Sequence, residues 1–453
     1  MNILVINGSP KGKWSITRKS AEYMEAVNPD HTFEYFDIGA TAKRLENDFS
    51  PAAEAIMRAE IILFSFPVYT FLAPSQLHHF MALLKAADLD LSGKSASIIT
   101  TSKHFYDVTA HRYVEDCCAD LGISFIKGLS ADMEDLVTEK GREEARMFFD
   151  YLIFAHSNWY YERPSAVSYT HMPVPVCAPI QRDTEPLPGG GVIVTDMQQD
   201  DVQLASMVEY FRSVFPQQTR IININECRID GGCLGCFGCA TSGKCIYKDG
   251  FDEFLRTQIQ AADFIIYAFS VKDHSMGVRF KTYDDRQFCN GHRTVTVGMP
   301  VGYIVSGSLS NEENLRTVLH ARADVGGNFL CGIATDEVNP SSELDKLAST
   351  LAYALENKHR APQTFWGVGG MKIFRDLIYQ MRGMMRADHK FYKAHGQYDF
   401  PQKKLGTILK MYLVGALISS PAIKKKMGNK MNEGMIAPYA KVVKEAKEKN
   451  GNK

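Results

Sequence analysis

The chain has 453 residues, of which 45% are hydrophobic and 23% are charged, and its formal net charge is −1 at pH 7. This length predicts two or three domains rather than one, and we expect no nucleic-acid partner. The first residues show neither the basic segment nor the long apolar segment of a signal peptide. The longest apolar run, residues 411–418, is shorter than the roughly 18 residues that span a bilayer, so we expect a cytoplasmic protein.

Apolar runs alternate with amphipathic segments through the first third of the chain. The apolar runs are residues 2–8, 32–38, 60–67, 95–102 and 124–131. Buried strands that alternate with helices are typical of a parallel sheet covered on both faces. The pattern therefore predicts an α/β domain over residues 1–160 with a doubly wound, five-stranded parallel sheet.

The alternating pattern stops and then starts again. Residues 161–190 are rich in proline and glycine, which predicts a linker. Five further strand candidates follow at similar spacing, at residues 191–196, 219–226, 263–270, 294–308 and 328–337. A second α/β domain over residues 191–345 is expected, and the two domains would form an internal pseudo-dimer.

The first strand runs into the loop "NGSPKGKWSIT", residues 7–17, ahead of a helix. Gly8 permits a sharp turn, and Ser9, Ser15 and Thr17 offer hydroxyls and amides at the helix N-terminus, where an anion is favoured. Lys11 adds positive charge. The loop is neither a dinucleotide fingerprint nor a Walker loop, so it indicates a phosphate site, with an ordinary serine cap as the alternative.

Two further loops are expected at the same edge of the sheet, after the third and fourth strands. They are residues 66–77 and 100–111, and both contain aromatic side chains. Loops in these positions converge near the switch point of a doubly wound sheet. Exposed aromatic rings usually mark a surface that a ligand or a partner covers. A phosphate site beside such rings indicates a mononucleotide with a planar ring.

Four cysteines occupy thirteen residues in "CLGCFGCATSGKC", residues 233–245. Clustered thiols in a reducing compartment favour metal or redox chemistry over structural disulfides. The spacing of Cys233, Cys236, Cys239 and Cys245 favours a cubane iron–sulfur cluster, with tetrahedral zinc and thiol–disulfide switching as alternatives. Cys227, just before the loop, is interpreted as a packing residue.

The loops "GSPKGKWSIT" and "FPVYTFLAP" resemble those of flavodoxin-like NADPH-dependent FMN reductases, and the cysteine spacing resembles that of the iron–sulfur flavoproteins. The resemblance covers residues 1–150 and 190–340. It implies FMN and a [4Fe–4S] cluster as cofactors, with NAD(P)H as a transient donor. The FMN contacts that it implies, in the phosphate loop and around the ribityl chain and flavin ring, are Ser9, Lys11, Ser15, Ile16, Thr17, Pro67, Val68, Tyr69, Thr70, Thr101, Ser102, His104, Tyr106 and Asp107.

The two halves differ in whether they contain the phosphate loop and the cysteine loop. The second half has Asp196, Asp200 and Asp201 where the first has its phosphate loop, and three carboxylates beside a phosphate are unfavourable. The first half has no cysteine loop. The hypothesis is therefore a flavin-dependent oxidoreductase in which electrons pass between FMN in the first domain and a cluster in the second. The alternatives are an NAD(P)H-dependent FMN or quinone reductase with a structural metal loop, and a redox-sensing interaction protein.

Weaker candidates surround these loops. His104 and Asp107 are proposed to relay protons beside the flavin, with a hydrogen-bonded loop as the alternative. In the second domain, the resemblance includes a pattern formed by Lys281, Asp285 and Arg286, for which we expect a structural role at the pseudo-dimer interface. Binding of a substrate anion is the alternative for the neighbouring residues His274, Arg279 and His292.

The remaining residues, 360–453, predict a basic helical extension. Residues 362–453 hold 18 Lys and Arg against 6 Asp and Glu, whereas the rest of the chain holds 33 against 46. We expect residues 408–427 to pack on the protein, with peripheral membrane contact as the alternative. The expected partners are a small-molecule or protein redox partner and, beyond the internal pseudo-dimer, a second copy of the chain.

Overall fold

The computed structural model describes the chain in five stretches, residues 1–39, 41–163, 170–181, 187–419 and 430–451. Residues 1–392 form one compact unit and residues 393–453 form a second. Parts of the expected linker, and the lysines at 424–426 in the expected tail segment, lie outside the described residues.

The first sheet is parallel and doubly wound. Its strands are β1 (Asn2–Asn7), β2 (Thr32–Asp37), β3 (Ile61–Pro67), β4 (Ser95–Ser102), β5 (Ser124–Phe125) and β6 (Leu129–Asp132). The order is β2-β1-β3-β4-β5, and β6 also pairs with β4, so the described residues give six strands rather than the expected five. The segment 124–131 splits in two at Gly128, whose backbone lies so close to Ile98 that a Cβ atom would be 2.7 Å from the Ile98 carbonyl oxygen.

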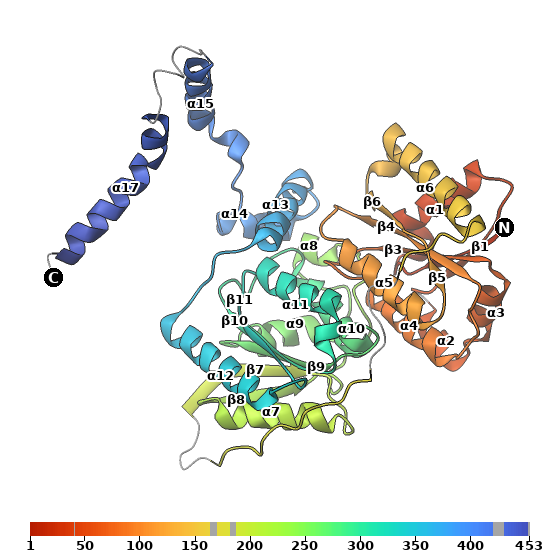
Figure 1. The fold of residues 1–453 in the computed structure, drawn as a ribbon, viewed down its shortest axis with the longest axis horizontal. Coiled ribbons are helices and arrows are strands. Elements are labelled where there is room, and N and C mark those ends of the chain that lie inside the picture. The colour runs from red at the N-terminus through yellow and green to blue at the C-terminus, as the bar shows by residue number, and fades with distance from the viewer. Residues whose placement is uncertain (40, 164–169, 182–186, 420–429, 452–453) are drawn as a thin grey trace. The chain divides into compact units, whose positions relative to one another are not determined.

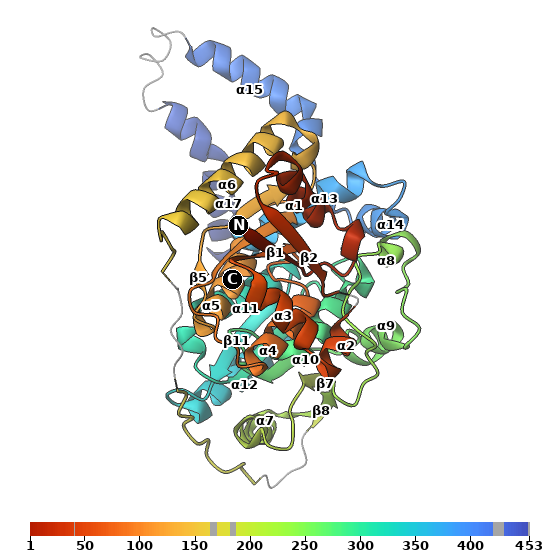
Figure 2. The ribbon, with the colours of Figure 1, turned by 90° about the vertical axis from the view of Figure 1, so that its right-hand side faces the viewer.

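Helices cover both faces of this sheet (Figure 2). One face packs on α1 (Ile16–Val27) and α6 (Glu139–Ser157). The other face packs on α3 (Ser50–Arg58), α4 (Ser75–Ala86) and α5 (Val108–Asp120). Shorter helical segments are η1 (Gly12–Trp14), α2 (Ala42–Asn47) and η2 (Asp135–Val137). Because β3 and β4 are buried on both faces, their sequences are almost continuously apolar or small.

The second sheet repeats the same topology (Figure 1). Its strands are β7 (Leu187–Thr195), β8 (Gln217–Asn223), β9 (Ile265–Ser270), β10 (Pro300–Ser306) and β11 (Phe329–Thr335), in the order β8-β7-β9-β10-β11. The tandem flavodoxin-like α/β fold is thus confirmed. The expected strand over 294–308 begins only at Pro300, because Asn328 Nδ2 donates to the Thr296 carbonyl (2.6 Å) and Gly298 adopts a φ of +82°, which hold the preceding residues in a turn.

Helices also cover both faces of the second sheet. α7 (Val202–Val214) and α12 (Pro340–Asn357) pack on one face, and α10 (Gly277–Arg286) and α11 (Glu313–Val325) pack on the other. The cysteine loop contains α8 (Gly238–Ser242). The shorter segments are α9 (Phe251–Phe254), η3 (Leu255–Ile259), η4 (Gln287–Asn290) and η5 (Leu309–Asn311).

The two α/β domains pack against each other through α4 with α10 and α5 with α11. Asp285 is fully buried and its Oδ2 accepts a hydrogen bond from the Ser75 amide (2.7 Å), while Asn314 Nδ2 donates to the Thr109 carbonyl (2.9 Å). Phe71 of the first domain is fully buried in the core of the second. These cross-domain contacts place the carboxyl edge of the first sheet beside the cysteine loop.

The C-terminal extension is helical, as expected. α13 (Phe365–Gln380) and α14 (Arg386–Ala394) follow the second domain, and η6 (Pro401–Lys403), α15 (Leu405–Ile418) and α17 (Lys430–Gly451) come after them. In the part of the chain that the structure describes, no helix has both the length and the apolarity needed to cross a membrane.

Candidate functional site

The loop after β1 is organised by Asn7, a residue that the sequence patterns do not single out. Asn7 Nδ2 donates to the Gly12 carbonyl (2.9 Å), and Asn7 Oδ1 accepts from the Ser9 amide (3.2 Å). Ser15 caps α1 by accepting a hydrogen bond from the Arg18 amide (3.4 Å). The loop therefore holds its amides and hydroxyls in place at the N-terminus of a twelve-residue helix, where an anion is favoured.

The hydroxyls of this loop are buried and face the end of a neighbouring strand. Ser9, Ser15 and Thr17 are each at most 2% exposed. Thr17 Oγ1 shares a 2.6 Å hydrogen bond with Thr101 Oγ1 of β4, which joins two of the three loops that the sequence places at this edge.

The loop after β3 has an unusual backbone. Thr70 and Phe71 both adopt left-handed conformations, with φ of 38° and 76°, although neither is glycine. Such conformations cost about 1–3 kcal/mol each and gather at ligand sites. The loop is held by a 2.8 Å hydrogen bond from the Tyr69 amide to the Leu72 carbonyl, which leaves Tyr69 and Thr70 at the cavity described below.

The loop after β4 also bends sharply, with positive φ at His104 and Tyr106. The His104 amide donates to Ser102 Oγ (2.8 Å), and Asp107 Oδ2 accepts a hydrogen bond from Ser130 Oγ. The His104 side chain is 52% exposed, and its Nδ1 lies 3.7 Å from Asp107. The Tyr106 ring instead packs on Phe71, with centroids 5.8 Å apart. His104, Tyr106 and Asp107 are absent from the lining of the cavity, whereas their neighbours Ser102 and Phe105 belong to it.

One cavity of about 250 Å³ joins the loops of both domains. From the first domain it is lined by the remaining residues that the sequence places around FMN, which are Ser9, Lys11, Ser15, Ile16, Thr17, Pro67, Val68, Tyr69, Thr70, Thr101 and Ser102. From the second domain it is lined by all four cysteines of the loop, Cys233, Cys236, Cys239 and Cys245. The structure therefore brings the two candidate cofactor loops to a single site.

The cysteine loop is shaped by left-handed residues, Gly235, Phe237 and Gly243, which let the chain fold back on itself. The Gly235 amide donates to Cys233 Sγ (3.4 Å), and Cys239 Sγ donates to the Phe288 carbonyl (3.1 Å). Burial raises the pKa of Cys233 to about 12 and also raises the pKa of Cys239, so both sulfurs are protonated thiols at neutral pH.

Cys289, a fifth thiol, also lines the cavity and is only 3% exposed. The sequence patterns miss it because it lies 44 residues beyond Cys245, at the end of η4. Among the described residues, no group of three or more His, Cys, Asp or Glu side chains is arranged so that it could hold a metal ion.

Arg286 supports the cysteine loop through buried polar contacts. It is 1% exposed and pairs with Asp249 through two hydrogen bonds of 2.6 and 2.9 Å, and it also donates to the Gly231 carbonyl (3.2 Å). Lys281 and Asp285 form a fully buried ion pair at the domain interface. These contacts give the Lys281, Asp285 and Arg286 pattern a structural role. His274 is also structural in position, because it bonds Asp120 of the first domain.

The Cys loop and the phosphate loop touch directly. Lys11 Nζ lies 5.4 Å from the centroid of the Phe237 ring, within the range of a cation–π contact. A Cβ atom on Gly235 would lie 2.7 Å from Tyr69 Oη, so only glycine lets the loop approach Tyr69 this closely. The first-domain loops and the cysteine loop are therefore in contact with each other beside the cavity that both of them line.

The C-terminal extension supplies the third wall of the cavity. Ile373, Phe374 and Leu377 of α13 line it. The Phe374 ring lies 5.7 Å from Phe105, and a Cβ atom on Gly370 would lie 2.4 Å from Phe105 Cζ. The N-terminus of α13 is fixed by Asp324, whose Oδ2 accepts from Thr364 Oγ1 (2.6 Å) and from the Gly367 amide (2.7 Å).

At the carboxyl edge of the second sheet, residues of the loop after β7 and of the linker bond to each other and to the end of β11. Asp201 Oδ2 accepts from the Gln198 amide (2.8 Å), and burial raises the pKa of Asp196 to about 6. From the linker, His171 Nε2 lies 2.9 Å from Asp336, and the Val174 amide donates to the Asp336 carbonyl (2.7 Å). The loop after β7 therefore presents carboxylates, and linker residues cover the end of β11.

Residues 1–116 match the family model described as NADPH-dependent FMN reductase. The iron–sulfur flavoprotein of Archaeoglobus fulgidus is 30% identical over 173 residues, which cover 36% of this chain and 78% of the archaeal protein. Among solved structures, an NADH:FMN oxidoreductase in its apo form has 20% identity and a TM-score of 0.30, covering 34% of this chain and 89% of that one. An NAD(P)H:quinone oxidoreductase from Methanothermobacter marburgensis has 14% identity and a TM-score of 0.28, covering 36% of this chain and 98% of that one.

The identity with the archaeal protein extends over most of that protein's length, and the family model matches the domain that carries the phosphate-loop candidate. The chain therefore belongs to the iron–sulfur flavoprotein family, within the flavodoxin-like NADPH-dependent FMN reductase superfamily, and is a flavin-dependent oxidoreductase.

Proposed function

We propose that this oxidoreductase binds FMN in its first domain and a [4Fe–4S] cluster in its second, and that electrons pass between the two within one chain. The observation that carries the proposal is the shared cavity, which is lined by the phosphate-loop residues of one domain and by the four cysteines of the other. When bound, FMN supplies both two-electron and one-electron chemistry, whereas an iron–sulfur cluster exchanges single electrons.

The residues at the first-domain edge fit a flavin mononucleotide. The N-terminus of α1 offers backbone amides, and the Ser9 and Ser15 hydroxyls lie beside them. Because Lys11 adds a cation, these groups together suit a phosphate group. Burial, together with the nearby acidic groups Cys233 and Asp285, raises the pKa of Tyr69 well above its ordinary value, so its hydroxyl keeps its proton and can donate a hydrogen bond into the cavity.

The cysteine loop fits a cluster by its donor set rather than by its present arrangement, so the thiols must move closer together when iron binds. Four thiols reach one cavity, and the Gly235 amide already donates to Cys233 Sγ, which is the kind of bond that stabilises a ligating sulfur. Because burial raises the pKa of Cys233, iron must displace protons from the thiols when it binds. The buried ion pair of Arg286 and Asp249 supports the loop, because Arg286 also donates a hydrogen bond to the Gly231 carbonyl.

Anaerobic reconstitution followed by flavin and metal analysis tests this proposal. We expect about one FMN and four iron atoms for each chain. The double variant C233S/C239S should lose the iron and keep FMN, and the control C227S should keep both, because Cys227 is absent from the cavity lining. Two FMN for each chain, or zinc in place of iron, would contradict the proposal.

A second candidate function is an NAD(P)H-dependent FMN or quinone reductase with a structural metal loop. The match of residues 1–116 to the NADPH-dependent FMN reductase model favours it. It requires that NAD(P)H oxidation by the loaded enzyme is undiminished in C233S/C239S. The proposal above instead requires that this variant delivers electrons to a one-electron acceptor far more slowly than the wild type.

A further inference from the structure

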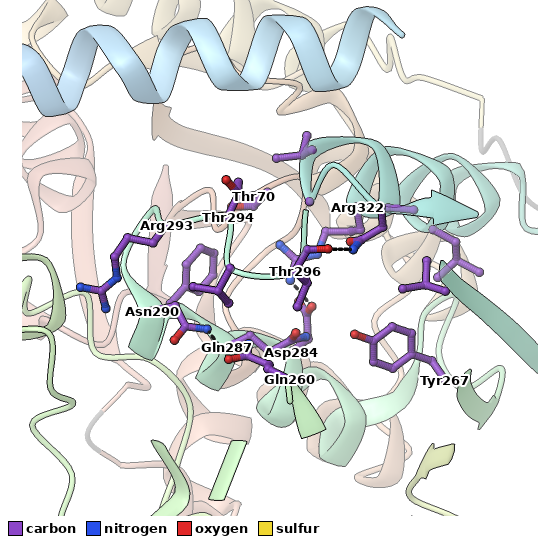
Figure 3. Close-up of a pocket in the computed structure, with 18 of the residues that line it drawn as sticks. Thr70, Gln260, Tyr267, Asp284, Gln287, Asn290, Arg293, Thr294, Thr296 and Arg322 are labelled. Atoms are coloured by element: carbon purple, nitrogen blue, oxygen red, sulfur yellow. Dashed lines mark hydrogen bonds and ion pairs between the residues drawn. The ribbon is translucent and has the colours of Figure 1, made fainter. Parts of the chain in front are cut away.

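A second cavity, of about 160 Å³, lies mainly against the second domain, with Thr70 of the first domain and Phe374 of α13 also in its lining (Figure 3). Its walls come from one face of β9 and β10, from α10 and α11, and from the turn that precedes β10. Val295 and Val297 of this turn are 43% and 54% exposed, so the turn is a thin cover at the protein surface. We call this space the side chamber.

The side chamber adjoins the cofactor cavity. Thr70, Phe288, Gly291, His292 and Phe374 line both spaces. A ligand in the side chamber would therefore share these lining residues with the proposed cofactor site. Neither the phosphate-loop residues nor the four cysteines take part in its lining.

Polar groups converge at one end of the side chamber. Tyr267, Asp284 and Arg322 lie around it in Figure 3. Asp284 Oδ1 pairs with Arg322, while Asp284 Oδ2 is buried with no hydrogen-bond partner in the described structure and has only Lys281 Nζ at 3.5 Å. Burial raises the pKa of Tyr267 to about 12, so its hydroxyl remains a donor at neutral pH.

The other side of the chamber is apolar. Phe269, Met276 and Phe280 form it together with Leu319. Flat rings are well accommodated between aromatic and thioether side chains. Because Arg322 is already paired with Asp284, the polar end carries no excess charge, which disfavours a free inorganic anion and favours a neutral ligand.

We propose that the side chamber binds a small, neutral aromatic ring that carries a hydroxyl group, the class of phenols. A hydroxyl on the ring can donate to Asp284 Oδ2, and the hydroxyl oxygen can accept from Tyr267 or Arg322. The ring then contacts Phe269, Met276 and Phe280.

Calorimetric titration of the purified full-length chain with phenol, and with toluene as a ligand of the same shape that lacks the hydroxyl, tests the proposal. We expect phenol to bind at least several-fold more tightly than toluene. The variant Y267F should weaken phenol binding by roughly two- to tenfold, the value of one hydrogen bond, and leave toluene binding unchanged. The control Y353F, at an exposed site on α12, should change neither.

A second variant fills the space. Ala323 lines the chamber from α11 and is 4% exposed, so A323L should abolish binding of both ligands, with folding checked by circular dichroism. Equal affinity for phenol and toluene, or phenol binding that neither variant changes, would overturn the proposal. The titration is repeated on protein that contains no flavin. A failure to find FMN or iron in the reconstitution experiment would contradict the proposed function, but it would leave the phenol affinity unchanged.

Discussion

Lys11 of the first domain lies with its Nζ atom 5.4 Å from the ring of Phe237 in the second. This contact joins the loop that suits a phosphate to the loop that carries four cysteines. The relationship is intramolecular, and Tyr69 and Gly235 reinforce it by their close approach. A single chain thus contains both halves of the proposed electron path.

Replacing Lys11 tests the phosphate site. K11M should weaken FMN binding by roughly 10- to 100-fold, because a hydrogen bond from a cation to a phosphate contributes about 1.5–3 kcal/mol. Flavin fluorescence titration measures the change. Lys13 is the matched control, since it lies near the same helix but is absent from the cavity lining, and K13M should bind FMN like the wild type. Equal losses in the two variants would show general charge attraction rather than a local contact.

Two adjacent glycines of α13 test the third wall of the cavity. G369A meets open space and should stabilise the helix by up to about 1 kcal/mol. G370A places a methyl group against Phe105 and should destabilise the fold by about 1–3 kcal/mol and open the cavity. Quenching of bound flavin fluorescence by iodide should rise in G370A and remain low in G369A. If the two variants give the same quenching, α13 does not shield the cofactor.

His274 makes the domain interface sensitive to pH. Burial lowers its pKa, but hydrogen bonds and charges from Asp120 and Glu312 outweigh burial and raise the pKa to about 10. Protonated His274 therefore stabilises the folded state fully below about pH 6.5, and this contribution declines as pH rises and is lost above about pH 10. We expect the melting temperature to fall over this range.

The variant H274Q isolates this effect. It should melt several degrees below the wild type at pH 6 and show a smaller difference at pH 10, when both are measured by scanning calorimetry. H359Q is the control, because His359 packs against Phe329 and Tyr353 and not at the domain interface. Its difference in melting temperature from the wild type should not show this dependence on pH. A constant difference between H274Q and wild type at all pH values would contradict the assignment.

Asp249 tests the support of the cysteine loop. D249N leaves the Arg286 cation buried without its paired charge, and loss of one partner of a buried pair costs about 3–5 kcal/mol. We expect the reconstituted variant to release iron to a chelator at least several-fold faster than wild type. Asp230 is an exposed neighbour whose pair with Arg228 lies at the surface, so D230N should release iron at the wild-type rate.

The sequence predicted the repeated fold because each buried strand is a compact apolar run and each loop after β1, β3 and β4 must reach the same sheet edge. It also placed Ser9, Lys11 and Thr17 together, since a strand-to-helix turn fixes their spacing. These inferences depend on local pattern and on topology, both of which a sequence displays directly.

The contribution of α13 could not be predicted in this way. Phe374 and Leu377 lie more than 350 residues from the phosphate loop, and their sequence shows only an apolar helix. The orientation of Tyr106 was also beyond pattern reasoning, because it depends on packing against Trp366 of the same helix. Long-range packing of this kind is decided by shape complementarity rather than by residue type.

The most direct test of the central claim is the kinetics of electron transfer from flavin to cluster after flash reduction of the flavin in the reconstituted protein. The account predicts a first-order rate that is independent of protein concentration. It also predicts no transfer when the flavin-retaining variant C233S/C239S is mixed with K11M that has been reconstituted with the cluster and without flavin. A rate that rises in proportion to concentration, or a mixture that transfers electrons as fast as the wild type, would contradict it.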